Sequence, residues 1–212
     1  MNRLTREQII EKIEVFGKIN LSHADLSHTD LSRIELKNAN LSHANLKKTN
    51  LSHADLAGAD LSNADISDAN LSHANLEYSN LNRADLSNAD LTGARLTGAN
   101  LSYVQFSGAK LSGAKLSGAY LSHAKLHKAD LSGTDLTHTC FDESYMMEVN
   151  LKEAVLLYTN LINSDLRNAE FAGADISNAN LSYADLRGAN MPQIDLSCSI
   201  LIGAKLTEET TE

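Results

Sequence analysis

The sequence predicts an all-β solenoid in which short extended segments alternate with tight corners. Every fifth residue from Leu21 to Leu206 is large and apolar, and 31 of these 38 positions are leucine. The residue two places before each of them is small or β-branched, most often alanine. Helices repeat every 3.6 residues and strands every 2, so a period of five belongs to neither alone.

Each five-residue unit contains an extended segment and a turn. In Ala24-Asp25-Leu26 the first and third side chains point to one side of the segment and the middle one points away. Ten of the eleven glycines and six asparagines stand two residues after the leucine, and Pro192 stands one residue after it. These residues suit the two central positions of a type II turn. Such units must wind into a solenoid whose stacked coils share one core.

The unit resembles the repeat of the pentapeptide-repeat family. Its pattern, Ala, then Asp or Asn, then Leu, is seen for example in 54–58 and 179–183, and the resemblance covers residues 19–208. It implies a right-handed quadrilateral β-helix with four units per coil, in which residues 20 apart lie above one another. About nine and a half coils, roughly 4.8 Å apart, would make a rod on the order of 45 Å long.

We expect a single elongated domain. A capping helix occupies residues 1–18, the solenoid residues 19–208 and an acidic tail residues 209–212. The first residues lead into a charged helix and not into the apolar core of a signal peptide. No apolar run approaches the roughly 18 residues that a membrane span needs. We therefore expect a cytoplasmic location and no contact with a membrane.

Residues 5–16 predict one α-helix. Thr5 and Gln8 have the spacing of a capping box, and Leu4 and Ile9 have that of a hydrophobic staple. An apolar stripe is predicted along the helix, made of Ile9, Ile10, Ile13 and Phe16. The helix could bind a partner, but we favour a lid on the first coil, because an exposed strand edge invites aggregation.

The C-terminal end has no comparable helix. Only six polar residues follow Leu206, and the last coil has Ile200 and Ile202 in outward positions. These three residues predict an oligomer end, where two copies meet about a two-fold axis. The alternative is that the acidic tail lies over the end.

Charge is divided unevenly along the chain, whose net charge is −9. Residues 91–129 contain no carboxylate and five basic residues, whereas residues 130–212 contain 14 acids and 4 bases. The basic residues predict a belt around the rod, formed by Arg95, Lys110, Lys115, Lys125 and Lys128. The belt is either a solvated surface or a docking site for an acidic partner.

A second candidate surface lies between residues 140 and 162, where outward positions become apolar. Its residues are Tyr145, Met147, Val155, Leu157 and Ile162. They form either a patch for a partner or scattered exposure, which is normal on protein surfaces.

The sequence offers little chemistry. Histidines recur at the second turn position, so that His23 would stack on His43 and His53 on His73, but no Cys or carboxylate completes a metal site. Cys140 and Cys198 would lie about three coils apart, too far for a disulfide. The aspartates and serines are repeat elements and not parts of a catalytic group. We expect no cofactor, no metal and no enzymatic activity.

Two functions remain open. The first is a protein-interaction scaffold, a rigid rod that presents four outer faces to an unidentified protein partner. The second follows from the family resemblance: some members imitate duplex DNA and bind a type II topoisomerase (gyrase), giving quinolone resistance or toxin immunity. A duplex of 45 Å carries on the order of 26 negative charges, against a net −9 here. The same acidity argues against direct binding of nucleic acid.

Overall fold

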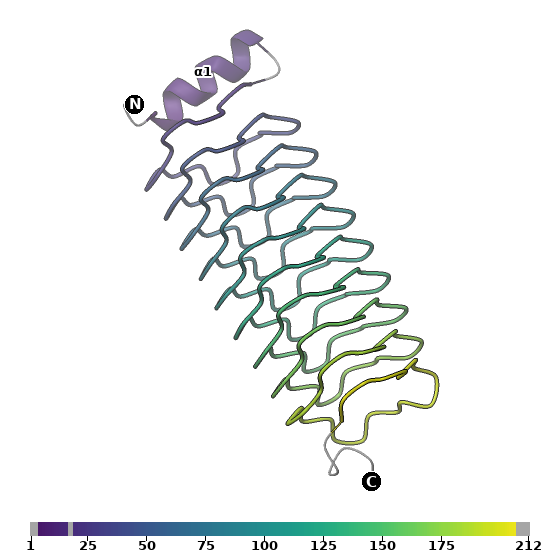
Figure 1. The fold of residues 1–212 in the computed structure, drawn as a ribbon. Coiled ribbons are helices and arrows are strands. Elements are labelled where there is room, and N and C mark those ends of the chain that lie inside the picture. The colour runs from purple at the N-terminus through teal and green to yellow at the C-terminus, as the bar shows by residue number, and fades with distance from the viewer. Residues whose placement is uncertain (1–3, 17–18, 207–212) are drawn as a thin grey trace.

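The chain folds as a rod of stacked coils with one helix at its N-terminal end (Figure 1). The computed structural model describes residues 4–16 and 19–206. Within 19–206 each coil takes 20 residues, because isolated parallel bridges join all but one of the middle residues to the residue 20 positions later, from Asn20↔Asn40 to Asp185↔Lys205. The described residues contain no longer strand. The three-residue strand expected in each unit is thus reduced to one bridge residue between two corners.

Hydrogen bonds between coils account for this arrangement. In most units the leucine and the second turn residue donate their N–H groups to the next coil: Leu41 donates to the Asp60 carbonyl (2.7 Å) and His43 to the Ser62 carbonyl (2.9 Å). The middle residue donates to the previous coil. Since the extended segment is so short, almost every backbone polar group must find its partner in a neighbouring coil or in a turn.

The corners have the features of type II turns. The Ala44 N–H donates to the Leu41 carbonyl at 3.0 Å, and the second turn residue has a positive φ, as in His43 (+58°). Asparagine or aspartate before the leucine supports the corner, since Asn40 Oδ1 accepts the Ser42 N–H at 3.0 Å. Many side chains besides glycine adopt this left-handed conformation here, although it costs on the order of 1 kcal/mol for each.

The core is the row of large apolar residues. From Leu21 to Leu186 none of them is more than 2% exposed. Some units have threonine in the small-residue position, and its buried hydroxyl donates a hydrogen bond to a backbone carbonyl of the preceding coil. Thr49 Oγ1 donates to the Leu26 carbonyl at 2.8 Å, and Thr139 Oγ1 to the Leu116 carbonyl at 3.0 Å. The interior is therefore filled by side chains along the length of the rod.

The N-terminal helix, α1 (Arg6–Phe16), covers the first coil. The capping box is confirmed: Thr5 N–H donates to Gln8 Oε1 at 2.9 Å, and Gln8 N–H to Thr5 Oγ1 at 3.4 Å. Leu4 N–H donates to the Asp25 carbonyl (3.0 Å) and Arg6 Nη1 to the Ser32 carbonyl (2.9 Å). In the rest of the solenoid, carbonyls at these positions accept N–H groups of the preceding coil. The segment at the start of α1 therefore supplies hydrogen-bond donors to the open edge of the first coil.

The predicted apolar stripe of α1 is only partly realised. Ile9 is fully buried, but Ile10 is 36% exposed, so its assignment to the stripe is wrong. The reason is that Ile9 and Ile10 are adjacent and point about 100° apart on a helix. The side chains of Ile13 and Phe16 lie outside the described residues. In the described part of the chain, no helix has the length and hydropathy to cross a membrane.

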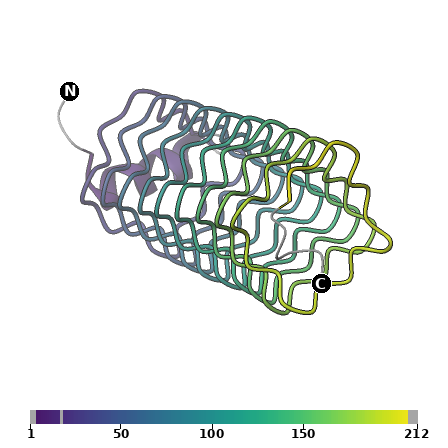
Figure 2. The ribbon, with the colours of Figure 1, turned by 60° about the horizontal axis from the view of Figure 1, so that its bottom comes forward.

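The last coil departs from the others. Between residues 191 and 199, no described backbone group is hydrogen-bonded to the preceding coil, and the bridge expected between Asp175 and Asp195 is missing. Figure 2 shows this coil, in yellow-green, extending beyond the outline of the stack. The acidic tail predicted at 209–212 lies outside the described residues.

Candidate interaction surfaces

The rod has four faces, each named here after the first residue at its centre. The Asn20, Asp25, Asp30 and Glu35 faces each continue through every twentieth residue. Between them run four corners, named 22–23, 27–28, 32–33 and 37–38 after their first turn residues, which also repeat every 20 residues. Each face and each corner is therefore a column of residues 20 positions apart, and its members follow directly from the sequence.

The structure spreads the predicted belt over three faces. Arg95 and Lys115 are bridged neighbours on the Glu35 face, and Lys110 lies at the centre of the Asp30 face. Lys125 lies on the Asp25 face, and Lys128 on the adjoining 27–28 corner. All five are exposed. A single partner surface can therefore reach only part of the belt.

Two of the five belt cations are already paired. Arg95 Nη2 lies 2.7 Å from Glu77 Oε1, and Lys128 Nζ lies 3.5 Å from Glu148 Oε2. Within the described residues the other three, Lys110, Lys115 and Lys125, have no ion pair.

Glycines leave the corner inside this belt bare. The 32–33 corner between the Asp30 and Glu35 faces has three consecutive glycines in its column, Gly93, Gly113 and Gly133. Near Gly113 and Gly133 no atom lies within 4 Å of where a Cβ would be. Lys110 and Lys115 therefore flank a corner that has no projecting side chain at the level of Gly113.

The predicted apolar residues do not lie together. Tyr145 is exposed on the Asp25 face, and Met147 is half-buried on the corner beside it. Val155 is half-buried on the Glu35 face. Leu157 and Ile162 are half-buried on the two corners that border the Asn20 face.

The three residues of the predicted oligomer end do lie close to that end. Ile200 is 46% and Ile202 is 65% exposed, whereas Leu206 is partly buried against the core. Ile200 continues the column of the Asn20 face, and Ile202 continues the 22–23 corner.

The Asn20 face is the surface that the sequence interpretation missed. All six tyrosines of the chain are exposed, and five of them lie on this face or its two corners. Tyr120 is at the centre, and the corner tyrosines are Tyr78, Tyr103, Tyr158 and Tyr183. Writing the tyrosine positions in a 20-residue register would have revealed this grouping.

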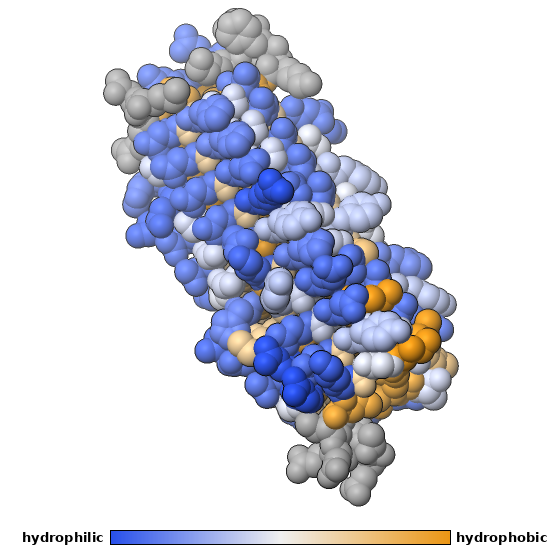
Figure 3. Space-filling view, viewed as in Figure 1, coloured by the Kyte–Doolittle hydropathy of each residue, from blue (hydrophilic) through white to orange (hydrophobic). Residues whose placement is uncertain are grey.

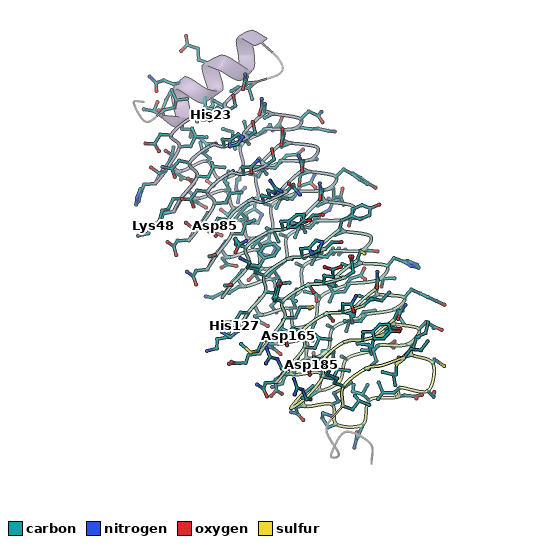
Figure 4. The ribbon with its side chains drawn as sticks, viewed as in Figure 1. His23, Lys48, Asp85, His127, Asp165 and Asp185 are labelled. Atoms are coloured by element: carbon teal, nitrogen blue, oxygen red, sulfur yellow. The ribbon has the colours of Figure 1, made fainter. Side chains whose placement is uncertain are left out.

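From residue 97 onward the Asn20 face and its corners contain only two charged residues, Asp142 and Glu143. Both have partners: Asp142 accepts hydrogen bonds from Ser122 and Cys140, and Glu143 Oε2 lies 3.4 Å from His123 Nδ1. The Asp25 face differs, and Figure 4 shows Asp85, Asp165 and Asp185 following one line along it. In the same view, Figure 3 shows hydrophilic residues there and hydrophobic ones to the right near the C-terminal end.

Cys140 is held as a neutral thiol. Burial, and then the neighbouring Asp142 carboxylate, raise the pKa of Cys140 above its usual value. Burial alone would raise the pKa of Asp142, but hydrogen bonds from Cys140 and Ser122 outweigh it and hold that pKa below its usual value. The thiol therefore donates to the carboxylate (2.9 Å) and is a poor nucleophile. Both cysteines are free.

Aromatic rings stack along the corners. His23 lies on His43 with ring centroids 4.8 Å apart, and His53 on His73 at 5.1 Å, as predicted. The 22–23 corner also contains a column that the sequence interpretation did not identify, in which Arg83 lies over Tyr103, Tyr103 on His123 and His123 beside Glu143. The described residues include no group of three or more metal-binding side chains.

Comparison with known proteins identifies the repeat. A family model for pentapeptide repeats matches in eight overlapping copies, at residues 19–56, 34–72, 64–102, 79–118, 105–142, 114–152, 144–182 and 174–208. The chain belongs to the pentapeptide repeat family. Membership implies the right-handed quadrilateral β-helix, and proteins of this family are generally structural or interaction proteins. No curated protein matches the chain.

Several solved structures resemble this pentapeptide repeat protein. HetL, involved in heterocyst differentiation regulation in the cyanobacterium Nostoc sp. strain PCC 7120, is 33% identical, with 96% of this chain and 95% of HetL covered and a TM-score of 0.59. A thylakoid-lumen member from Arabidopsis thaliana is 29% identical over 46% of this chain and 68% of its own (TM-score 0.45). QnrB1, a plasmid-mediated fluoroquinolone resistance protein, is 23% identical over 92% of this chain and 94% of its own (TM-score 0.43). With TM-scores below 0.5, the last two support no further comparison.

Proposed function

We propose that this protein is a non-enzymatic interaction scaffold, a rigid rod whose outer faces bind a protein partner. The belt is the observation that carries the proposal. Three exposed lysines, which have no ion pair within the described part of the chain, lie in a segment that contains no carboxylate, on a chain that is otherwise acidic. The rod interior is filled by leucine, which leaves the outer faces as the place for function.

The acidic partner docks over the bare 32–33 corner. Lys110 lies on one side of that corner and Lys115, with Arg95 next to it, on the other. Since Gly113 adds no side chain between them, one acidic surface can approach Lys110 and Lys115 together. Charges at the edge of an interface mainly steer association and select the partner.

An affinity capture from the native host tests this docking site. We expect the partner to be retained by the wild-type protein and to be lost with added salt. It should also be lost from the double variant Lys110→Glu/Lys115→Glu. The matched control is Lys125→Glu, a belt lysine on the Asp25 face, which does not border the 32–33 corner, and this variant should retain the partner. Equal retention by all three proteins would exclude the 32–33 corner as the docking site.

The C-terminal end offers a second contact in this proposal. Ile200 and Ile202 are exposed, and residues 191–199 lack the backbone pairing found elsewhere, so end-to-end contact between two copies would cover apolar surface. Mimicry of DNA has weaker support, because the belt interrupts the negative surface that a mimic needs. Inhibition of supercoiling by purified gyrase at micromolar protein would favour the mimic over the scaffold.

A further inference from the structure

The two corners that border the Asn20 face match each other level by level. In every coil the face segment has a 37–38 corner before it and a 22–23 corner after it, five residues later. If two rods lie side by side and parallel, related by a two-fold axis along their length, the Asn20 faces meet. The 22–23 corner of one copy then lies opposite the 37–38 corner of the other at the same level.

Shape is complementary at the level of Gly118. The 22–23 corner projects Tyr103 and His123, whose rings stack 4.6 Å apart. Across the face, at these same levels, the second turn residue of the 37–38 corner is Gly98 or Gly118, and the Tyr78 ring of the preceding coil lies over Gly98, 2.7 Å from where a Cβ would be. No atom lies within 4 Å of a Cβ added at Gly118. The projecting His123 ring of each copy therefore meets a bare edge at Gly118 of the other, while Tyr103 meets the Tyr78 ring. The symmetry makes both contacts twice.

Charge and hydropathy match at the neighbouring levels. Glu143 would lie opposite His138 of the second copy, and Arg83 opposite Glu77 and the exposed Tyr78 ring. One level beyond Glu143, Ile162 would lie opposite Leu157. At the centre of the face Tyr120, which is 57% exposed, would meet Tyr120 of the second copy.

The face is also large enough and neutral enough for self-association. The accessible surface of the chain is 9802 Å². One of the four faces, counted along one half of the rod, therefore has an area on the order of 1,200 Å², above the roughly 800 Å² that each partner buries in a standard interface. Two chains of net charge −9 repel one another. They meet with least repulsion at the Asn20 face, which from residue 97 onward has only two carboxylates, Asp142 and Glu143, both already partnered. Tyrosine is enriched in interfaces, while Lys, Glu and Asp are depleted there.

We propose that two copies of this chain pair side by side through their Asn20 faces, in parallel, about a two-fold axis along the rod. This goes beyond partner binding at the belt, which lies on the other three faces and stays accessible in the pair. The contact is also distinct from end-to-end contact at the last coil. Both contacts double the mass, but a side-by-side pair keeps the length of one rod, whereas an end-to-end pair has twice that length.

The test combines sedimentation equilibrium with small-angle X-ray scattering at tens of micromolar protein. We expect a mass of about 46 kDa, twice the 22.9 kDa of one chain, and a maximum dimension close to that of one rod. Gly118→Lys places an ammonium group in the contact and should raise the dimer dissociation constant at least about a hundredfold. Lysine already occupies this turn position at Lys48 and Lys128, so the variant should fold.

Gly113→Lys is the matched control. Gly113 has nearly the same φ (+66° against +67°) and the same open space, but lies on the 32–33 corner away from the contact. It should dimerise like the wild type. A charge exchange adds a rescue: Glu143→Lys and His138→Glu should each weaken the dimer, and the double variant should restore it. A monomeric wild type, a 46 kDa species of doubled length, or equal dimerisation of the Gly118→Lys and Gly113→Lys variants would each overturn the proposal.

Discussion

The middle coils and the last coil share one repeat sequence but are held differently. In the middle, each leucine donates to the next coil, as Leu116 does to the Asp135 carbonyl at 2.8 Å. In the last coil, the segment 191–199 makes no described backbone hydrogen bond to its neighbour. Apolar residues that are buried in the middle become partly exposed there, Leu201 among them. The comparison shows that a unit is stabilised by its neighbours on both sides more than by its own sequence.

The small-residue position also differs between these regions. It is alanine in most units. Isoleucine stands there only in the first and last coils, at Ile19, Ile34 and Ile194. A larger side chain in a narrow, well-packed layer forces the wall apart. We infer that Ile194 contributes to the separation of residues 191–199 from the coil below. At the opposite end α1 covers the coil that contains Ile19 and Ile34.

Truncating a core leucine should give the largest difference between the two regions. Leu116→Ala opens a cavity at a fully buried site and should cost about 3 kcal/mol of unfolding free energy. Leu201→Ala, in the last coil, should cost about 1 kcal/mol, because this side chain is already partly exposed and its site can relax. Urea unfolding followed by circular dichroism measures both. Equal losses would show that the last coil is packed as firmly as the middle.

Much of this architecture could be predicted from the sequence, because period five leaves the backbone few choices. The 20-residue register, the buried leucine row, the positive φ at the corners and the Thr5–Gln8 capping box are all local or periodic consequences of residue type. The exposure of Ile10 was predicted wrongly, because the pattern did not show which side of α1 faces the first coil.

The outer surfaces could be predicted less well. The belt residues were identified by composition, but composition alone did not show that they lie on three faces, or that Glu77 neutralises Arg95. The Asn20 face was missed because its successive tyrosines are 17 to 38 residues apart in sequence. They form one surface only when the coil register is applied to the outward positions as well as to the core.

The ion pair of Asp165 and Arg167 should give a smaller effect. It joins two residues of the same unit, with Arg167 Nη2 2.6 Å from Asp165 Oδ2, so it supports a corner and does not tie one coil to the next. The arginine, chiefly through its side-chain hydrogen bond, holds the pKa of Asp165 below the usual value of 3.8. A lowered carboxyl pKa stabilises the fold above the unfolded pKa, and this contribution is lost as pH falls through the folded pKa.

Melting temperatures measured from pH 7 to pH 2.5 test that effect. Asp165→Asn should melt a few degrees or less below the wild type at pH 7, and the difference should vanish below the folded pKa. Asp85→Asn, on the same face but without an ion pair in the described structure, serves as the control for the loss of a carboxylate at this position of the repeat. A difference that grows as pH falls would contradict the assigned sign.

Amide hydrogen exchange, resolved by residue, tests most directly whether the rod is one stack held from coil to coil. We predict the slowest exchange for the inter-coil donors between about residues 41 and 170, with Leu116 among them, and fast exchange for amides between 191 and 199. Fast exchange throughout 41–170, or protection of 191–199 equal to that of the middle coils, would contradict the account.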